Sequence, residues 1–217
     1  MKLTRTFDLD NTDRKRKIWF MSDLHYNHLN IMKFCGRPFE TVEEMNDYIL
    51  NELSDKISKN DILFDLGDMI WKESQEDVKL LGDLLPIESY KIMGNHDSIG
   101  SYQSNQKKYW KVITDLLDIQ IIYKGERIKL VLSHYPILDW NGKYHGSINL
   151  HGHSHGNNDP DNKGILRYDL GFDATLAKKY GSFLMPFEFI WEETKILTSG
   201  KSYESWVREL LKEREKK

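Results

Sequence analysis

The first half of the chain alternates short apolar runs with segments of helical periodicity. Residues 18–21 are apolar, rich in β-formers and followed abruptly by polar residues, which predicts a buried strand. Thr41 and Glu44 form a capping box, and apolar residues then recur at spacing four from Met45 to Ile57, which predicts a helix with one buried face. The other elements expected in this half are a helix, a strand, a helix and a strand, at 29–34, 62–64, 75–85 and 90–93. This order predicts a parallel β-α-β-α-β unit, in which the polar cluster after each strand lies at one common sheet edge.

From residue 119 onward the pattern changes to consecutive strands. Apolar runs on either side of a turn at Gly125 and Glu126 predict a hairpin, so this half is expected to form a more antiparallel sheet. The strands expected here lie at 119–123, 128–132, 147–150 and 165–172. Helices are expected at 106–117 and at about 202–215, the latter an amphipathic C-terminal helix, while 187–191 fits either a strand or a helix start. Residues 1–217 are expected to form a single domain.

Composition narrows the classes of partner. With 31 Lys and Arg against 34 Asp and Glu, the net charge of -3 gives no broad electrostatic reason to bind duplex nucleic acid or an anionic membrane. The charge run at 13–17 is typical of a solvated lead-in to the first predicted strand. Cys35 is the only cysteine, which excludes an intrachain disulfide and favours a reducing cytoplasm. No apolar run approaches the ~18 residues of a membrane span, so a cytoplasmic protein without a membrane partner is expected.

The first candidate functional residues lie directly after the first predicted strand. Asp23 and His25 leave that strand two residues apart and can turn toward one point, where hard oxygen and borderline nitrogen ligands suit a divalent transition metal. A single pair of this kind is more often a hydrogen-bonded loop pair than a metal site. The metal interpretation gains its weight from similar clusters after later strands.

All eight histidines lie between His25 and His155, and most stand beside Asp, Asn or Gly at predicted strand ends. The ordered set is Asp23-x-His25, Gly67-Asp68, Gly94-Asn95-His96-Asp97, His134 and Gly152-His153-x-His155. This set resembles the five motifs of the calcineurin-like metallophosphoesterase superfamily. The segments 22–28 and 33–39 are similar to its small phage and bacterial branch, and the whole resemblance covers residues 18–173.

The resemblance implies an α/β fold with four layers in the order αββα, in which two mixed sheets are flanked by helices. It also implies two divalent cations, with manganese favoured among Mn, Fe, Zn, Ni and Co. The ligands of the first would be Asp23, His25 and His155. Those of the second would be Asn95, His134 and His153, and Asp68 would bridge both.

Three further residues have expected roles near the substrate. His96 would face the phosphate as a catalytic residue and Asp97 would fix its tautomer, although His96 could instead only hydrogen-bond Asp97. Asn95 would contact substrate as well as metal. His28 could line the substrate pocket or serve a structural role, and Asp173 could orient a metal-bound histidine or be a plain turn carboxylate.

The expected reaction is hydrolysis of a phosphomonoester or phosphodiester, of a nucleotide-like substrate, by metal-activated hydroxide. One alternative is a nuclease of the same superfamily that acts on DNA or RNA. Another is a non-catalytic protein-binding scaffold, which the complete set of ligand positions disfavours. The segment 152–156 also fits the nucleophile elbow of a serine hydrolase, but a helix should follow that elbow and a base histidine should lie downstream. The sequence does not indicate an oligomeric state.

Overall fold

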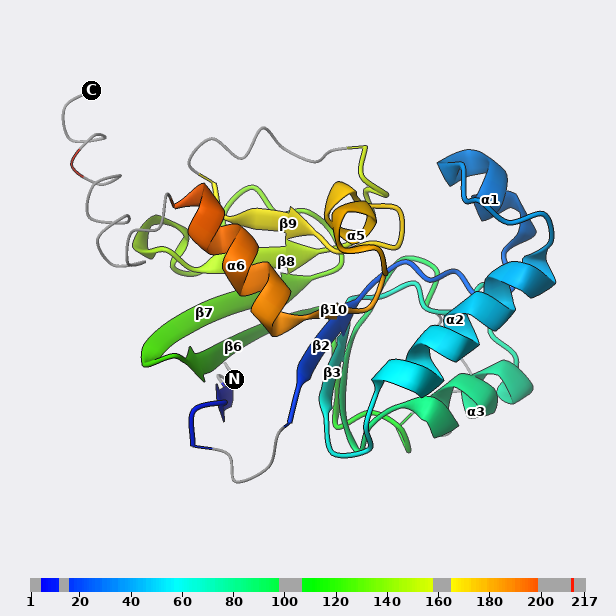
Figure 1. Ribbon diagram of the computed structural model, residues 1–217, viewed down its shortest axis with the longest axis horizontal. Helices are drawn as coiled ribbons and strands as arrows, with labels where there is room; N and C mark the ends of the chain where they lie inside the picture. Colours follow the sequence, from blue (N-terminus) through cyan, green and yellow to red (C-terminus); the bar gives the residue numbers. More distant parts are fainter. Residues whose placement is uncertain (1–4, 12–15, 98–106, 158–164, 199–211, 213–217) are drawn as a thin grey trace.

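The computed structural model describes residues 5–11, 16–97, 107–157, 165–198 and 212, and these contain two five-stranded β-sheets (Figure 1). The first sheet has the strand order β1-β6-β7-β8-β9 and the second the order β10-β2-β3-β4-β5. The strands are β1 (Arg5–Asp8), β2 (Ile18–Met21), β3 (Ile62–Asp65), β4 (Glu88–Ile92), β5 (Val112–Thr114), β6 (Leu116–Tyr123), β7 (Glu126–Ser133), β8 (Ile148–His151), β9 (Arg167–Asp169) and β10 (Met185–Pro186). The helices are α1 (Leu29–Cys35), α2 (Val42–Lys56), α3 (Gln75–Leu84), α5 (Thr175–Tyr180), α6 (Phe187–Leu197) and the 3₁₀ helix η1 (Lys143–His145).

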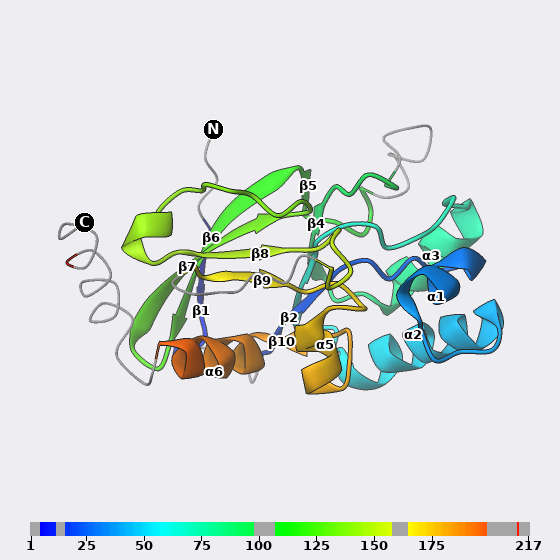
Figure 2. The ribbon, with the colours of Figure 1, turned by 90° about the horizontal axis from the view of Figure 1, so that it is seen from above.

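The β-α-β-α-β unit expected in the first half is confirmed. Strands β2, β3 and β4 are parallel and in register, so that Met21, Asp65 and Lys91 lie side by side near their carboxyl ends. The expected capping box begins α2, where the Thr41 hydroxyl accepts a hydrogen bond from the Glu44 amide. Helices α2 and α3 cover the face of the second sheet that points away from the first (Figures 1 and 2).

The first sheet is less antiparallel than the strand pattern predicts. The hairpin of β6 and β7 is antiparallel as expected, but β7 pairs parallel with β8, β8 parallel with β9, and β1 parallel with β6. The chain returns from the end of β7 to the start of β8 through η1, and a connection of this length permits parallel pairing. The result brings the carboxyl ends of β7, β8 and β9 to one edge.

Two other expectations change in the structure. The helix expected at 106–117 is wrong over its described part, because Val112–Thr114 forms β5 and Leu116 begins β6. Val112 and Ile113 are β-branched and pair with the free edge of β4, and this pairing outweighs the local helical spacing. The segment 187–191 is a helix, and 202–215 lies outside the described residues apart from Lys212.

One apolar cluster fills the space between the two sheets. Phe20, Phe64 and Tyr90 project into it from the second sheet as a stack of rings, and alternate residues of β6, β7 and β8 meet them from the first. The inner face of α6 also joins this cluster, through Phe187, Ile190 and Trp191. None of the helices in the described part of the chain is long and apolar enough to cross a lipid bilayer.

The two sheets meet at the edge where the ligand-type residues lie. Ser22, directly after β2, forms an isolated parallel bridge with Gly171, two residues after β9. The loops after β2 and β3 are also joined, because the amides of Asp23 and His25 donate to the carbonyls of Gly67 and Asp68. Loops from both sheets are therefore fixed against one another at one point.

Candidate metal centre

Strained backbone is concentrated at this junction. Asp23, His25, Asp68, His153 and His155 all adopt positive φ angles, between 49° and 68°, and they make up five of the eight described non-glycine residues that do so. Such a conformation costs on the order of 1–3 kcal/mol per residue and persists only where the surroundings enforce it. The left-handed backbone conformation breaks the strand-like alternation of side chains in these loops and directs them toward a common point.

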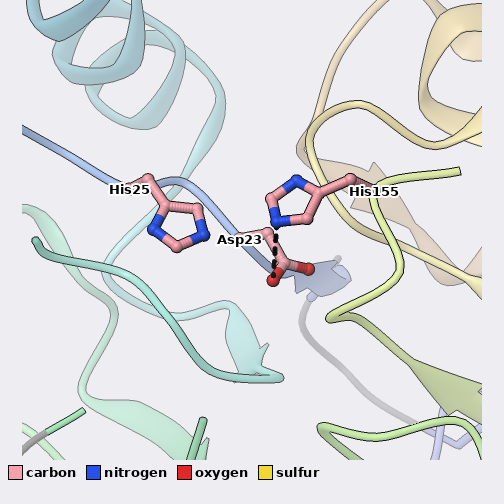
Figure 3. A group of neighbouring side chains, drawn as sticks. All are labelled: Asp23, His25 and His155. Atoms are coloured by element: carbon pink, nitrogen blue, oxygen red, sulfur yellow. Dashed lines mark ion pairs between the residues drawn. The ribbon is translucent and has the colours of Figure 1, made fainter. Parts of the chain in front are cut away.

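Asp23, His25 and His155 converge from different sheets (Figure 3). One potential ligand atom of each lies within 4.8 Å of the others, and His155 Nε2 lies 3.9 Å from Asp23 Oδ1. The His25 and His155 rings are nearly parallel, with centroids 5.2 Å apart. The three residues that the resemblance assigns to a first cation thus lie together.

The residues expected at a second cation form an adjoining group. Asn95 Oδ1 lies 3.1 Å from His134 Nε2 and 2.9 Å from His153 Nδ1. Asp68 lies between the two groups, because its Oδ2 is 3.4 Å from His134 Nε2 and 3.8 Å from His25 Nε2. All seven expected ligands are therefore brought together, with Asp68 in the central position.

Several buried polar atoms at this site lack hydrogen-bond partners in the described part of the chain, which fits cation binding. Asp23 Oδ1 and both ring nitrogens of His25 are buried without a hydrogen-bond partner among the described residues. Leaving such atoms unpaired costs roughly 1–3 kcal/mol each, so native proteins rarely tolerate several at one point. A carboxylate oxygen and an imidazole nitrogen are ordinary ligands of divalent transition metals, and a bound cation would satisfy them.

Two glycines allow the loops to approach Asp68. A Cβ atom on Gly67 would lie 2.6 Å from His134 Nδ1, and one on Gly94 would lie 2.7 Å from the Asp68 carboxyl carbon. Both distances are too short for a real contact. The Gly-Asp and Gly-Asn-His-Asp motifs therefore need their glycines so that the loops after β3 and β4 can pack against each other and against His134.

The pKa values of Asp23 and Asp68 are shifted in opposite directions. Burial raises the pKa of Asp23 to about 7, and the nearby His134 and His155 offset only part of that effect. Burial also disfavours the charged form of Asp68, but hydrogen bonds from His134 and from the His96 amide outweigh it and lower the pKa of Asp68 to about 2. Asp68 thus keeps its charge at neutral pH, while Asp23 lacks sufficient positive charge around it.

The pKa values of the histidines at the centre are also shifted in different directions. Burial lowers the pKa of His25 to about 3, and burial is likewise the main reason that the pKa of His153 is lowered. Burial opposes the charged form of His155 as well, but hydrogen bonds to Asp173 and Cys35 outweigh it and raise its pKa to about 10. His25 is therefore neutral and ready to coordinate at pH 7, whereas His155 carries a proton that a cation would have to displace.

Arg37 is a residue whose role the sequence did not reveal. Its buried guanidinium makes two 2.9 Å bonds to the Asp173 carboxylate and donates to the carbonyls of Asp23 and Leu24. Asp173 in turn lies 2.9 Å from His155 Nδ1, which directs the other ring nitrogen toward Asp23. Arg37 thereby ties the strained loop after β2 to the segment after β9. The only signal in the sequence was its position in the 33–39 segment.

Asp97 has different partners from those expected. One carboxylate oxygen lies 2.9 Å from Lys91 Nζ, and the other accepts hydrogen bonds from the amides of Asp68 and Gly94. Lys91 is buried on β4 and also bonds Asp65 at 2.8 Å. Asp97 therefore joins the loops after β3 and β4 through their backbone amides. A hydrogen bond from Asp97 to the His96 ring, which would fix the His96 tautomer, is not among the contacts of the described residues.

His96 and His28 lie on one side of the ligands. His96 is exposed, and its ring centroid lies 5.3 Å from that of His25 and 4.7 Å from that of Trp71. His28 is buried and stacks on Trp71 with centroids 3.8 Å apart and planes at 4°. The exposed ring of His96 is thus accessible to a ligand at the centre, whereas His28 supports Trp71.

The family model for calcineurin-like phosphoesterases matches residues 16–170. The chain belongs to the calcineurin-like phosphoesterase family. Members of this family generally hydrolyse phosphoester bonds and bind divalent metal ions. The match confirms the superfamily that the five motifs indicate, while the narrower phage and bacterial branch stays a prediction.

Two other proteins are similar to this chain. Uncharacterized protein MJ1445 of Methanocaldococcus jannaschii is 36% identical over 143 residues, which are 65% of this chain and 71% of that protein. The crystal structure of AQ665, a protein of unknown function from Aquifex aeolicus, matches with a TM-score of 0.58 and 25% identity. The match covers 82% of this chain and 98% of that chain.

Cation binding should release protons from this family member at neutral pH. His155, with its pKa raised to about 10, is protonated at pH 7, and Asp23, with its pKa raised to about 7, is partly protonated. Calorimetric titration of the metal-free protein with Mn²⁺ at pH 7, in buffers of different ionisation enthalpy, should show net release of one or more protons. The apparent affinity should rise with pH. Binding without net proton release would contradict the prediction that His155 and Asp23 carry protons that the cation displaces.

Proposed function

We propose that this protein hydrolyses phosphoester bonds at a centre of two divalent cations. The observation that supports this most is that Asp23 and His25 carry buried atoms without hydrogen-bond partners among the described residues and lie next to Asp68. A carboxylate oxygen of Asp23 is within 4.8 Å of one of Asp68, and His25 Nε2 is 3.8 Å from Asp68 Oδ2. A non-catalytic scaffold of the same fold would have no reason to retain these uncompensated atoms or the strained loops that present them.

In this proposal Asp23, His25 and His155 hold one cation, and Asn95, His134 and His153 hold the other. Asp68 would contribute a ligand to both, because its carboxylate lies between His25 and His134 and stays ionised. When bound, such a cation pair lowers the pKa of a shared water and neutralises charge on the phosphoryl group. Asn95 supplies a neutral oxygen, which adds a ligand without reducing the positive charge of the pair.

His96 is the proposed catalytic residue among the protein side chains. Its amide donates a 2.8 Å hydrogen bond to Asp68 Oδ1, which fixes the residue next to the bridge, and its ring lies at the open edge beside Trp71. From there the imidazole can donate a hydrogen bond to the phosphoryl group or a proton to the leaving oxygen. Asp97 is proposed as a positioning residue, which holds the His96 loop through the amide of Gly94.

The serine-hydrolase alternative gains no support from the site. Ser154 is buried, and residues 155–157 continue as a turn where a nucleophile elbow would begin a helix. His153 and His155, on either side of Ser154, are directed to Asn95 and Asp173.

Replacing Asp68 by Asn should abolish hydrolysis of bis-p-nitrophenyl phosphate and weaken retention of both cations, because the substitution removes the negative charge between them. Metal content after desalting, measured by mass spectrometry alongside turnover, tests this. Asp77→Asn, at an acidic position in the first turn of α3, is a suitable control that should retain activity and metal. Turnover at the wild-type level in Asp68→Asn would defeat the assignment of the bridge.

Replacing His96 by Ala should lower kcat by ~10²-fold or more at unchanged metal content, because the side chain acts on the substrate and not on the cations. Steady-state kinetics and metal analysis of the same preparation test this. If His96→Ala lost metal in proportion to activity, His96 would belong to the ligands instead.

A further inference from the structure

The candidate centre is bordered on one side by a row of aromatic rings, Phe34, His28 and Trp71, here called the Trp71 flank. Trp71 and His28 are stacked, and Trp71 also contacts the ring of His96. Phe34 extends the row outward, with its ring edge-on to His28 at 6.4 Å and its side chain 75% exposed. This flank borders the Asp23, His25 and His155 group, since the His28 and His25 ring centroids are 5.3 Å apart.

Tyr135 borders the other ligand group. Its ring centroid lies 4.5 Å from that of His153 and 5.1 Å from that of His134, and the residue is 49% exposed. Tyr135 follows His134 directly after β7, in the first sheet, whereas Trp71 and Phe34 follow β3 and β2 of the second. The two aromatic surfaces therefore flank different halves of the candidate centre.

Phe34 and Tyr135 are the exposed members of these surfaces, at 75% and 49%, whereas Trp71 is half-buried and His28 is buried. A ring that stays about half exposed gains only a fraction of its burial free energy, so large aromatic residues at an open site are typical of ligand contacts. Arg37, which could otherwise attract a multiply charged phosphate chain, is buried and bound to Asp173 and to backbone carbonyls. The surroundings of the centre thus offer flat apolar faces next to a phosphate position.

We infer that the substrate is a short nucleoside phosphodiester, such as a dinucleotide, with one nucleoside against Tyr135 and the other against the Trp71 flank. This inference rests on the proposed phosphoester hydrolysis. A monoester has one organic substituent and could use only one of the two surfaces. A diester places one substituent on each side of the phosphorus. Any of the nucleobases can stack on an exposed aromatic ring, because every base has a flat π-face.

The test compares two diesters with the same charge and the same leaving group, the p-nitrophenyl ester of thymidine 5′-phosphate and methyl p-nitrophenyl phosphate. With the manganese-loaded full chain, kcat/KM should be about tenfold or more higher for the thymidine ester, because only that substrate carries a nucleoside. Tyr135→Ala or Phe34→Ala should reduce this preference several-fold, mainly through KM. Tyr144→Ala and Ile87→Ala remove residues that are 46% and 68% exposed away from the two flanks and should leave the preference unchanged.

A binding measurement separates this inference from the proposed reaction. Calorimetry on the manganese-loaded protein should show tighter binding of thymidine 5′-monophosphate than of methyl phosphate, with the difference reduced in Tyr135→Ala or Phe34→Ala. If that pattern appears without turnover of either diester, the proposed reaction fails and the nucleoside subsites stand. The inference would be overturned if the wild-type protein showed equal kcat/KM values for the two diesters and equal affinities for the two monophosphates. It would also be overturned if both variants retained the wild-type preference for the nucleoside compounds.

Discussion

The structure depends on one electrostatic constraint, the burial of two carboxylates, Asp23 and Asp68, at the junction of the two sheets. Asp68 is compensated by hydrogen bonds from His134 and from the amide of His96, whereas Asp23 is undercompensated and has a pKa raised to about 7. Removing a charge from water costs several kcal/mol even after relaxation, and opposite charge close by must offset that cost. His25 is neutral, and His134 and His155 offset the burial of Asp23 only in part, so a bound divalent cation would supply the positive charge that this junction lacks.

Two buried ion-pair networks keep the constrained loops in place. In the first, Arg37 and Asp173 join the loop after β2 to His155 across the boundary between the sheets. In the second, Lys91 and Asp97 join the ends of β3 and β4 to the amide of Asp68. Each network orders backbone on one side of the centre, which is how several residues with positive φ can persist at one site. Rigid support of this kind maintains the ligand positions that the reaction needs.

The sequence predicts which residues gather at the junction better than it predicts the supporting structure. Those residues could be found because Asp, His, Asn and Gly recur directly after apolar runs, and that pattern is local, while their roles as ligands are what the family resemblance implies. The strands β2, β3 and β4 were predictable for the same reason, since each is a short apolar run followed by a polar cluster. Strand β5 and the parallel pairing of β7, β8 and β9 were not, because both depend on which edge each strand meets in three dimensions. The roles of Arg37 and Lys91 were hidden as well, since their partners lie 136 and 26 residues away.

The positions of bound cations can be measured directly in crystals. Crystals of the full chain grown with Mn²⁺ and measured at the manganese absorption edge would locate the ions by their anomalous scattering. Two peaks are expected on either side of the Asp68 carboxylate, one next to Asp23 and His25 and the other next to Asn95 and His134. No peak at this junction under saturating manganese, or peaks only at surface carboxylates elsewhere, would contradict this expectation.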